Sequence, residues 1–535
     1  MVRKCVTSAI ITCFVLAKCV GSSDPFIDLN HYLRMPKLFA YDDYDECFNG
    51  YSSLDPMYCV VRSVIKPNNR SDLWNLIENF SNDTYRHFRH NHLDRGICLE
   101  RCRRMLVGLQ NDTLQQLYVD KFQIDFAYIM EPAAFENGAE DRSTYGQLIN
   151  VCVNHELNRS HNLSAYSEIE YCTRPERHIN LDLLDLSFIA VSLLLIFLVM
   201  ASSWFDRQLN LRQHEADHYR KNLACSKTML LTAFSLKRNW HRLTGQSRDQ
   251  LNEDLRFFQT IRFLTFCLVV MMHPASWYLA TDFQLFTLGM ILVVAVVKYP
   301  RLKLKLYSLA AAVSIILPAL VIYFGEFDGT FIVRLQDQRF YYWYDRMYRE
   351  VYIPTHTNMG CYLGGIILGA IYYSQRKNHA VGNRAWYLQL LWYTVVPVGF
   401  LTMMSNVIFY QNNFEKPSLW MALFYPAMKN SWVLLGAISL YGMIYEYNKL
   451  VKDFLSSSFF VPLGRLSYCA YVCHMALLKL VFFGTRETRY FGQMALISST
   501  IMVVILSYAF ALILALLLEL PVTAIQKYLF AGKLG

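Results

Sequence analysis

Long apolar runs constrain this chain more than any other feature of its sequence. The segments 186–200 and 495–518 are mainly apolar, and a helix needs about 20 apolar residues to cross a bilayer. Only 17% of the residues are charged, whereas soluble domains carry about a quarter. We therefore expect a polytopic α-helical membrane protein. The net charge of +9 does not indicate nucleic-acid binding, because the basic residues flank the apolar runs.

Charge on the connecting loops predicts the number and direction of the spans. The loop 206–256 contains ten Lys and Arg, whereas the turn 274–278 contains none. Because basic loops stay in the cytosol, this alternation favours an outside head and a cytosolic C-terminus. The luminal turn 485–494 fits least well, since it carries Arg486 and Arg489. The nine predicted spans are 186–204, 257–273, 279–297, 306–324, 358–373, 387–410, 430–446, 465–484 and 495–518.

Before the first span, the chain has the pattern of a secreted domain. Residues 1–22 are typical of a signal peptide, with Arg3 and Lys4 before a short apolar stretch. Six cysteines follow in residues 23–180, and an even number in this setting predicts three disulfides with fifteen possible connectivities. We expect Cys98 and Cys102 to share one face of a helix and to bridge two other segments. The six cysteines are Cys47, Cys59, Cys98, Cys102, Cys152 and Cys172.

Glycosylation sequons occupy the same segment. Each of six asparagines begins an Asn-x-Ser/Thr triplet, and no such triplet follows the first span. We therefore predict a disulfide-rich, glycosylated, mainly α-helical luminal or extracellular domain, and a location in the plasma membrane or the endoplasmic reticulum. The six asparagines are Asn69, Asn79, Asn82, Asn111, Asn158 and Asn162.

Two histidine patterns suggest metal binding, and we reject both. His214-Glu215-Ala216-Asp217-His218 fits the zinc-protease pattern, in which two imidazoles and a carboxylate share one helix face. It lies in the basic linker with no evident third ligand. The histidines of segment 85–92 fit a solvated face. We therefore predict no metal site.

Polar side chains inside apolar spans point to function, because an ionisable group in lipid costs about 2.5–3.5 kcal/mol and so faces a polar interior. Four such residues are present: Arg262, His273, His474 and Glu519. For His474, a hydrogen-bonded core position is the favoured interpretation on periodicity alone. Glycines at small-x-x-x-small spacing in the fifth span predict close helix packing, and these are Gly360, Gly364, Gly365 and Gly369.

Several motifs together resemble the nose-resistant-to-fluoxetine family of animal proteins. These proteins join a cysteine-rich luminal domain to a membrane domain of the acyltransferase-3 superfamily. The resemblance extends from about residue 40 to the end of the chain. In the head it rests on Gly96-Ile97-Cys98, Ile149-Asn150-Val151-Cys152 and the segment 166–172. In the membrane part it rests on the segment 254–262, the pair Arg262 and His273, Trp277-Tyr278-Leu279-Ala280, Asp282-Phe283-Gln284-Leu285, the segment 352–358, the segment 463–474 and Glu519-Leu520-Pro521.

The resemblance implies an organisation and an activity. It implies a luminal domain at 23–180, a span at 186–204, a cytosolic linker at 206–256, an acyltransferase-like membrane domain at 257–521 and a tail at 522–535. It also implies transfer of an acyl group from an acyl-CoA-type co-substrate to a hydroxylated or lipid acceptor, with no bound cofactor. The base is then His273 and the supporting cation Arg262, with His474 and Glu519 as further candidates.

One departure from the family concerns the segment after His273. Members of the family carry further helices between this histidine and the Trp-Tyr-Leu-Ala motif, whereas here Pro274-Ala275-Ser276-Trp277 follows directly. The shortened chain is therefore expected to be catalytically impaired. An isoform or a defective gene assignment would produce such a chain. The second hypothesis is a lipid or drug carrier without turnover, and a third is an inactive form that only binds partners.

Overall fold

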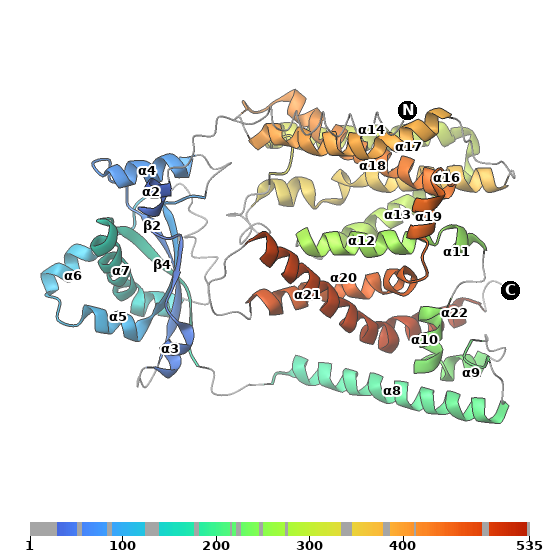
Figure 1. Ribbon diagram of the computed structural model, residues 1–535, viewed down its shortest axis with the longest axis horizontal. Coiled ribbons are helices and arrows are strands. Elements are labelled where there is room, and N and C mark those ends of the chain that lie inside the picture. The colour runs from blue at the N-terminus through green and yellow to red at the C-terminus, as the bar shows by residue number, and fades with distance from the viewer. Residues whose placement is uncertain are drawn as a thin grey trace.

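The computed structural model contains a mixed α/β head followed by a helical bundle (Figure 1). It describes residues 29–50, 56–82, 88–123, 139–175, 181–213, 217–220, 226–245, 250–272, 277–332, 345–377, 386–410, 414–483 and 492–531. The predicted signal peptide lies outside these ranges. In the head the elements are α2 (Leu29–Leu33), β1 (Phe39–Tyr41), α3 (Tyr44–Asn49), β2 (Tyr58–Ile65), α4 (Asp72–Asn82), β3 (His92–Cys98), α5 (Leu99–Leu106), α6 (Asn111–Leu117), α7 (Ala139–His161) and β4 (Ala165–Thr173).

The centre of the head is a four-stranded sheet in the order β1-β3-β2-β4. Strand β2 pairs antiparallel with both β3 and β4, whereas β1 pairs parallel with β3. All eight residues of β2 are buried. The prediction of a mainly helical head was therefore incomplete, because it omitted this sheet. The β-branched run of β2 favours a strand, but its pairing partners lie far away in the sequence.

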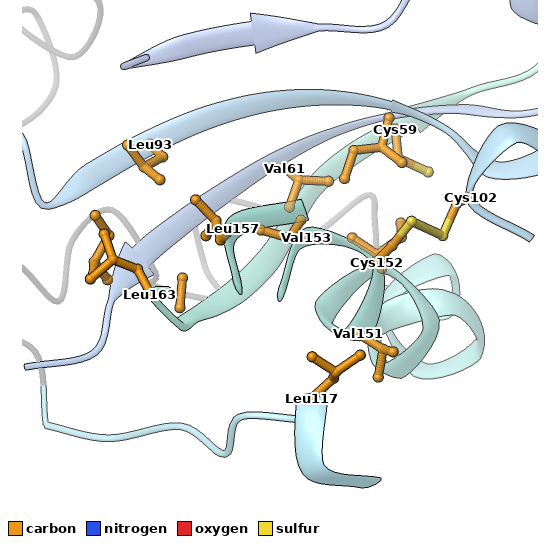
Figure 2. Packing of buried hydrophobic residues seen from close by; sticks show 14 of the residues in the cluster. Cys59, Val61, Leu93, Cys102, Leu117, Val151, Cys152, Val153, Leu157 and Leu163 are labelled. Atoms are coloured by element: carbon orange, nitrogen blue, oxygen red, sulfur yellow. A yellow bond between two sulfur atoms is a disulfide. The ribbon is translucent and has the colours of Figure 1, made fainter. Parts of the chain in front are cut away.

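Helix α7 covers one face of the sheet and completes the core of the head (Figure 2). Val153 and Leu157 of α7 pack in the same cluster as Val61 of β2 and Leu93 of β3. Their side chains are almost fully buried. Burying a side chain of this size contributes about 1.5–3 kcal/mol, so the helix and the sheet stabilise each other.

Three disulfides hold the head together, which confirms the predicted number of pairs. They join Cys47 to Cys98, Cys59 to Cys172, and Cys102 to Cys152. The first ties α3 to the end of β3, the second links β2 to β4, and the third links α5 to α7 (Figure 2). Cys98 and Cys102 do bridge two different segments, as expected. They do not share a helix, because Cys98 ends β3 and caps the N-terminus of α5.

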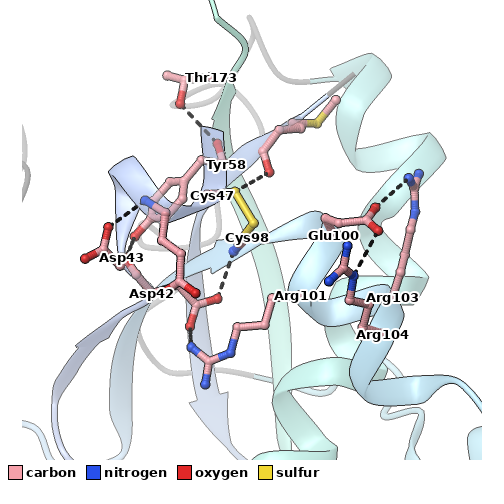
Figure 3. Close-up of a disulfide and its surroundings, with 12 residues drawn as sticks. Asp42, Asp43, Cys47, Tyr58, Cys98, Glu100, Arg101, Arg103, Arg104 and Thr173 are labelled. Atoms are coloured by element: carbon pink, nitrogen blue, oxygen red, sulfur yellow. Dashed lines mark hydrogen bonds and ion pairs between the residues drawn. A yellow bond between two sulfur atoms is a disulfide. The ribbon is translucent and has the colours of Figure 1, made fainter. Parts of the chain in front are cut away.

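Polar contacts surround the Cys47–Cys98 disulfide (Figure 3). Asp42 accepts a hydrogen bond from the Cys98 amide at 2.9 Å and forms an ion pair with Arg101. Burial raises the pKa of the Asp42 carboxyl, and the Cys98 amide and Arg101 oppose that rise. The Tyr58 hydroxyl donates to the Asp42 carbonyl oxygen at 2.9 Å. These bonds fix the end of the sheet from which the chain continues to the membrane helices.

The predicted solvated face of histidines in segment 85–92 is wrong for His90, which is buried, and burial also affects His92 at the start of β3. His92 makes the stability of the head dependent on pH. Burial, assisted by Arg89, lowers its pKa from about 6.5 to about 4. Between those values the unfolded chain binds more protons than the folded one, so the free energy of unfolding falls as pH falls. The stabilisation is complete above pH ~6.5, and up to about 3 kcal/mol is lost by pH ~4. Asp42 affects the free energy of unfolding in the opposite direction. Because its pKa is raised in the folded head, its contribution to stability increases as pH falls.

Hydrogen exchange of β3 in the full chain, at pH 7 and pH 5, measures this loss. In the variant His92→Gln, the protection of β3 should change less between pH 7 and pH 5 than in the unsubstituted chain. The reason is that the contribution of His92 to the pH dependence is removed. His161→Gln, at an exposed hydrogen-bonding position, is the matched control and should keep the full slope. An unchanged slope in His92→Gln would assign the acid sensitivity to other groups.

The bundle places a helix at each of the nine predicted spans. Its elements are α8 (Leu183–Gln213), α9 (Ser226–Leu231), α10 (Leu236–Thr244), α11 (Gln250–Asp254), α12 (Phe257–Met272), α13 (Trp277–Lys298), η3 (Pro300–Leu302), α14 (Lys303–Gly325), η5 (Tyr348–Tyr352), η6 (Thr355–Thr357), α16 (Met359–Lys377), α17 (Trp386–Ser405), η7 (Asn406–Tyr410), α18 (Leu419–Ile444), α19 (Lys449–Leu455), α20 (Phe460–Phe483), α21 (Gln493–Leu514), η8 (Ala515–Glu519) and α22 (Leu520–Ala531). Helix α18 begins eleven residues before the predicted span, because the helix continues through Pro426 and Lys429.

Five stretches of the described chain are long and apolar enough to cross a membrane. A sixth apolar helix, Phe257–Val270, is shorter. The head lies at one end of the bundle, whereas α10 and α22 lie at the opposite end (Figure 1). The chain is thus a membrane protein with several apolar helices. The five stretches are Leu183–Arg212, Ala280–Lys298, Pro300–Gly325, Trp386–Tyr410 and Gln493–Leu529.

The glycine motif of α16 packs against α18 through its first half. A Cβ on Gly360 would overlap the side chain of Asn430, and a Cβ on Gly364 would overlap Val433. Gly365 and Gly369 have no neighbouring atom within contact distance of an added Cβ. The predicted close approach of helices therefore occurs at two of the four glycines.

Candidate functional site

Helices α12 and α20 meet at a glycine, and a basic cavity lies beside this contact. Gly464 of α20 lies directly on the backbone of Gln259 in α12, where any added Cβ would overlap main-chain atoms. Small residues allow such close approach between apolar helices. The contact brings the segment 254–262 beside the segment 463–474, which are two of the motif regions identified in the sequence.

A cavity of about 340 Å³ opens beside this contact, at the end of α12 farthest from the head (Figure 1). Three arginines line it, against a single glutamate. Guanidinium groups bind phosphates and carboxylates in a bidentate manner. The cavity is therefore suited to an anionic ligand. Its lining comprises Asn252, Glu253, Leu255, Arg256, Phe258, Gln259, Arg262, Val461 and Arg465.

The three arginines differ in their other contacts. Arg256 forms an ion pair with Glu253 at 2.6 Å. Arg465 donates to the carbonyl oxygens of Arg242, Leu243 and Gly245 at 2.6–2.8 Å, and so caps the C-terminus of α10. Arg262 is exposed, and within the described ranges no carboxylate forms an ion pair with it. Its guanidinium is therefore the one most available to an incoming anion.

The candidate base His273 lies outside the described residues, one position beyond the end of α12 at Met272. On a continuous helix it would lie about 16 Å from Arg262 along the axis. The two side chains therefore cannot act on the same atom. Arg262 belongs to the basic cavity, and the role of His273 stays a prediction.

His474 has the environment of a core histidine, as its periodicity favoured. Its side chain is fully buried in α20 and packs edge-to-face on Phe266 of α12, with 5.8 Å between ring centroids. Its Nδ1 lies 2.5 Å from the Tyr471 carbonyl oxygen. An imidazole nitrogen in this position carries the proton. His474 therefore anchors α20 to α12, one turn beyond Arg262.

Glu519 contacts α20 at a different residue. Its carboxylate accepts a hydrogen bond from the Cys469 thiol at 2.9 Å. This contact joins η8 to the middle of α20. The structure thus places His474 and Glu519 on the same helix bundle as Arg262, but Glu519 supports Cys469 rather than the cavity.

A second polar cluster lies in the half of the bundle nearer the head. Its Asn358 belongs to the motif segment 352–358, but the sequence pattern did not single out its Lys429. The Lys429 ammonium of α18 donates to the Asn358 side-chain oxygen at 2.7 Å, and the Tyr425 hydroxyl lies 3.4 Å away. Asn358 in turn donates to the carbonyl oxygens of Tyr352 and Pro354. A lysine inside an otherwise apolar helix was the signal that could have found this cluster.

The segment 352–358 also contacts α13, which begins at Trp277, four residues after His273. Thr281 of α13 donates to the Ile353 carbonyl oxygen at 3.2 Å, and Thr355 donates to the Gln284 side chain. Two further motif regions, 277–285 and 352–358, are therefore brought together. Lys429 and Asn358 hold the loop 352–358 against α13.

Only the last two residues of the zinc-protease pattern, Asp217 and His218, lie among the described residues. His218 is buried, and its Nε2 lies 2.9 Å from an Asp206 carboxylate oxygen. Arg238 donates to the same carboxylate at 2.8 Å, and Ser235 donates at 2.6 Å. His214 and Glu215 lie outside the described residues. Among those that are described, no group of three or more metal-binding side chains occurs.

No family model, no curated protein and no solved structure matches this chain.

Proposed function

We propose that this chain is built as a membrane-bound acyltransferase, which moves an acyl group from an acyl-CoA-type donor to a hydroxyl acceptor. The observation that carries the proposal is the basic cavity at the N-terminal end of α12. A coenzyme A thioester carries several phosphate charges, and arginines bind phosphates through charge-assisted hydrogen bonds. Arg262 would bind the phosphates of the donor in this cavity. The acyl chain of the donor would extend along the apolar helices.

The proposed reaction conserves atoms and charge. His273 removes the proton from the acceptor hydroxyl, and the oxygen attacks the thioester carbonyl. The carbon–sulfur bond breaks, the ester forms, and the thiolate of coenzyme A receives the proton. General base catalysis of this kind contributes about 10²–10⁴-fold, and imidazole titrates in the appropriate range.

Binding of a non-reactive acyl-CoA analogue to the purified chain tests the donor site. Arg262→Gln should weaken binding roughly tenfold to a hundredfold, because a hydrogen bond to a charged group is worth about 1.5–3 kcal/mol. Arg301→Gln is the control, since Arg301 is exposed at η3 and does not line the cavity. Equal losses in both variants, or no loss in Arg262→Gln, would contradict the donor site.

A carrier of lipids or drugs is the second candidate function. The partly buried polar cluster of Lys429 and Asn358 favours it, because polar groups within a bundle mark paths for substrates. Uptake that persists without acyl transfer, and that responds to Lys429→Met but not to His273→Ala, would support the carrier.

We also propose that the head is luminal or extracellular, that nine helices cross the membrane, and that the C-terminus is cytosolic. All six sequon asparagines are exposed, as an acceptor for glycosylation requires. Removal of N-glycans should therefore lower the apparent mass on a gel. In sealed microsomes, a C-terminal tag should be digested by added protease while the head is protected. A tag protected until the membrane is permeabilised would exclude an odd number of spans.

A further inference from the structure

Helix α10 lies across the end of the bundle that is farthest from the head. Its first amide, that of Leu236, donates to Ser203 of α8 at 3.0 Å. Its last carbonyls accept from Arg465 of α20. Ser203 lies at the end of the apolar run of α8, and Arg465 lies at the start of that of α20. Both ends of α10 are therefore at the level where apolar helices leave a bilayer.

The preceding helix, α9, is at the same level. The Ser202 hydroxyl of α8 donates to the Leu231 carbonyl oxygen at 2.7 Å. Trp204, two residues further along α8, is exposed, and tryptophan at the end of an apolar span marks the headgroup region. The chain from α9 to α10 thus follows the plane of the membrane surface.

Large apolar side chains dominate the exposed side of this segment. Leu231 is 53% exposed and Trp240 is 46% exposed, and Leu230 and Leu236 are exposed as well. On α10, Leu236 and Trp240 share one face, since they are four residues apart. The opposite face, with Arg238, Asn239 and Leu243, is buried in the protein. A helix with its apolar face turned away from the protein requires another apolar surface.

The segment is also held rigidly in this orientation. Arg238 and Ser235 bind the buried carboxylate of Asp206. The Asn239 side chain donates to the Ala233 carbonyl oxygen at 2.9 Å. The apolar face therefore cannot turn inward without breaking buried polar contacts.

We propose that α9 and α10 form a membrane-surface element that binds the lipid leaflet on the side away from the head. Leu230, Leu231, Leu236 and Trp240 insert among the lipid chains, and the exposed Lys227 and Lys237 contact anionic headgroups. Such helices combine an apolar face with flanking cations. The span of α8, of which only 6% is buried, is a continuous lipid-facing surface beside it. The occupant is therefore lipid.

Depth-resolved fluorescence quenching tests this proposal in the full chain reconstituted in lipid nanodiscs. A version without its free cysteines receives one label, at Leu231→Cys or Trp240→Cys. Leu193→Cys, in the middle of α8, is the reference inside the bilayer, and Asp217→Cys is the reference in water. We expect labels at 231 and 240 to be quenched by nitroxide lipids and shielded from aqueous iodide. Their quenching should resemble that of the label at 193 and differ from that of the label at 217.

Two results would overturn the proposal. Quenching of positions 231 and 240 by iodide, as at 217, would place the segment in water. Shielding from both quenchers would show that protein, such as a second copy, covers it. Oxidative footprinting of Trp240 in the unsubstituted chain checks the same point without labels, and protection in nanodiscs is expected.

The headgroup contact has its own test. Lipid quenching at 240 should be stronger in nanodiscs with phosphatidylserine than in nanodiscs of phosphatidylcholine alone. This difference should be lost in the double variant Lys227→Gln/Lys237→Gln, whereas Lys303→Gln/Lys305→Gln should retain it. If the difference persists in the first double variant, the two lysines do not bind headgroups.

Discussion

Replacing His273 by Ala is expected to abolish the proposed acyl transfer in a version of this chain that is lengthened after residue 273 by the helices that the resemblance to the nose-resistant-to-fluoxetine family implies. Loss of the base alone should lower the rate about 10²–10⁴-fold. The chain without these helices should be nearly inactive even with His273 present, because misplacement of reacting groups by about 1 Å can lower a rate about 100-fold. Pro274 also disfavours helical backbone at His273.

The measurement is acyl transfer in membranes that contain equal amounts of each form, with and without His273→Ala. Arg262→Gln in the longer form serves as the matched control, since it should weaken donor binding while leaving a measurable rate at saturating donor. Equal, His273-dependent rates in both forms would show that the additional helices are dispensable. If no form transfers acyl groups and both alter lipid or drug uptake, the carrier hypothesis is supported instead.

The second large effect is expected at Asp206, whose carboxylate is completely buried between α8 and α10. Asp206→Asn leaves the Arg238 guanidinium buried without its charge partner. Removing one member of a buried ion pair costs about 3–5 kcal/mol. Limited proteolysis should therefore cut the variant within the linker at protease concentrations that leave the unsubstituted chain intact.

Asp217→Asn is the control for this experiment. Asp217 is exposed, and its ion pair with Arg220 is long, at 3.8 Å. Exposed pairs contribute about 0–1 kcal/mol, so the control should resist protease like the unsubstituted chain. If Asp206→Asn is equally resistant, the buried carboxylate does not hold the linker in place. The labelled positions 231 and 240 should become accessible to water in the sensitive variant.

The sequence predicted the features that depend on local composition. Apolar runs predicted the helices of the bundle, and the count of cysteines in one segment predicted three disulfides. It did not predict the sheet of the head, because β2 pairs with strands that are distant along the chain. It also could not show that Asp206, Ser235 and Arg238 meet, since such contacts depend on packing rather than on periodicity.

The candidate site was predictable only in part. Arg262 was identified as a charged residue in an apolar helix, and the structure places it in the basic cavity. Arg256 and Arg465 were not assigned to that cavity, because they are separated by more than two hundred residues and meet only through the contact at Gly464. Lys429 was missed for a different reason. The predicted span began one residue after it, so the lysine was not counted among the charged residues within spans.

The position of the Cys59–Cys172 disulfide has a mechanical consequence. Cys172 is the last residue but one of β4, just before the chain leaves the head for α8. A force that pulls the head away from the membrane therefore reaches this residue after the contacts of Thr173 with Tyr58 and of Arg174 with Asp141. It passes through the covalent bond into β2, which is one of the two inner strands and pairs on both sides. The disulfide bears the load in place of the remaining hydrogen bonds between β2 and β4. The two strands are therefore not pulled apart, and the tension passes into the sheet.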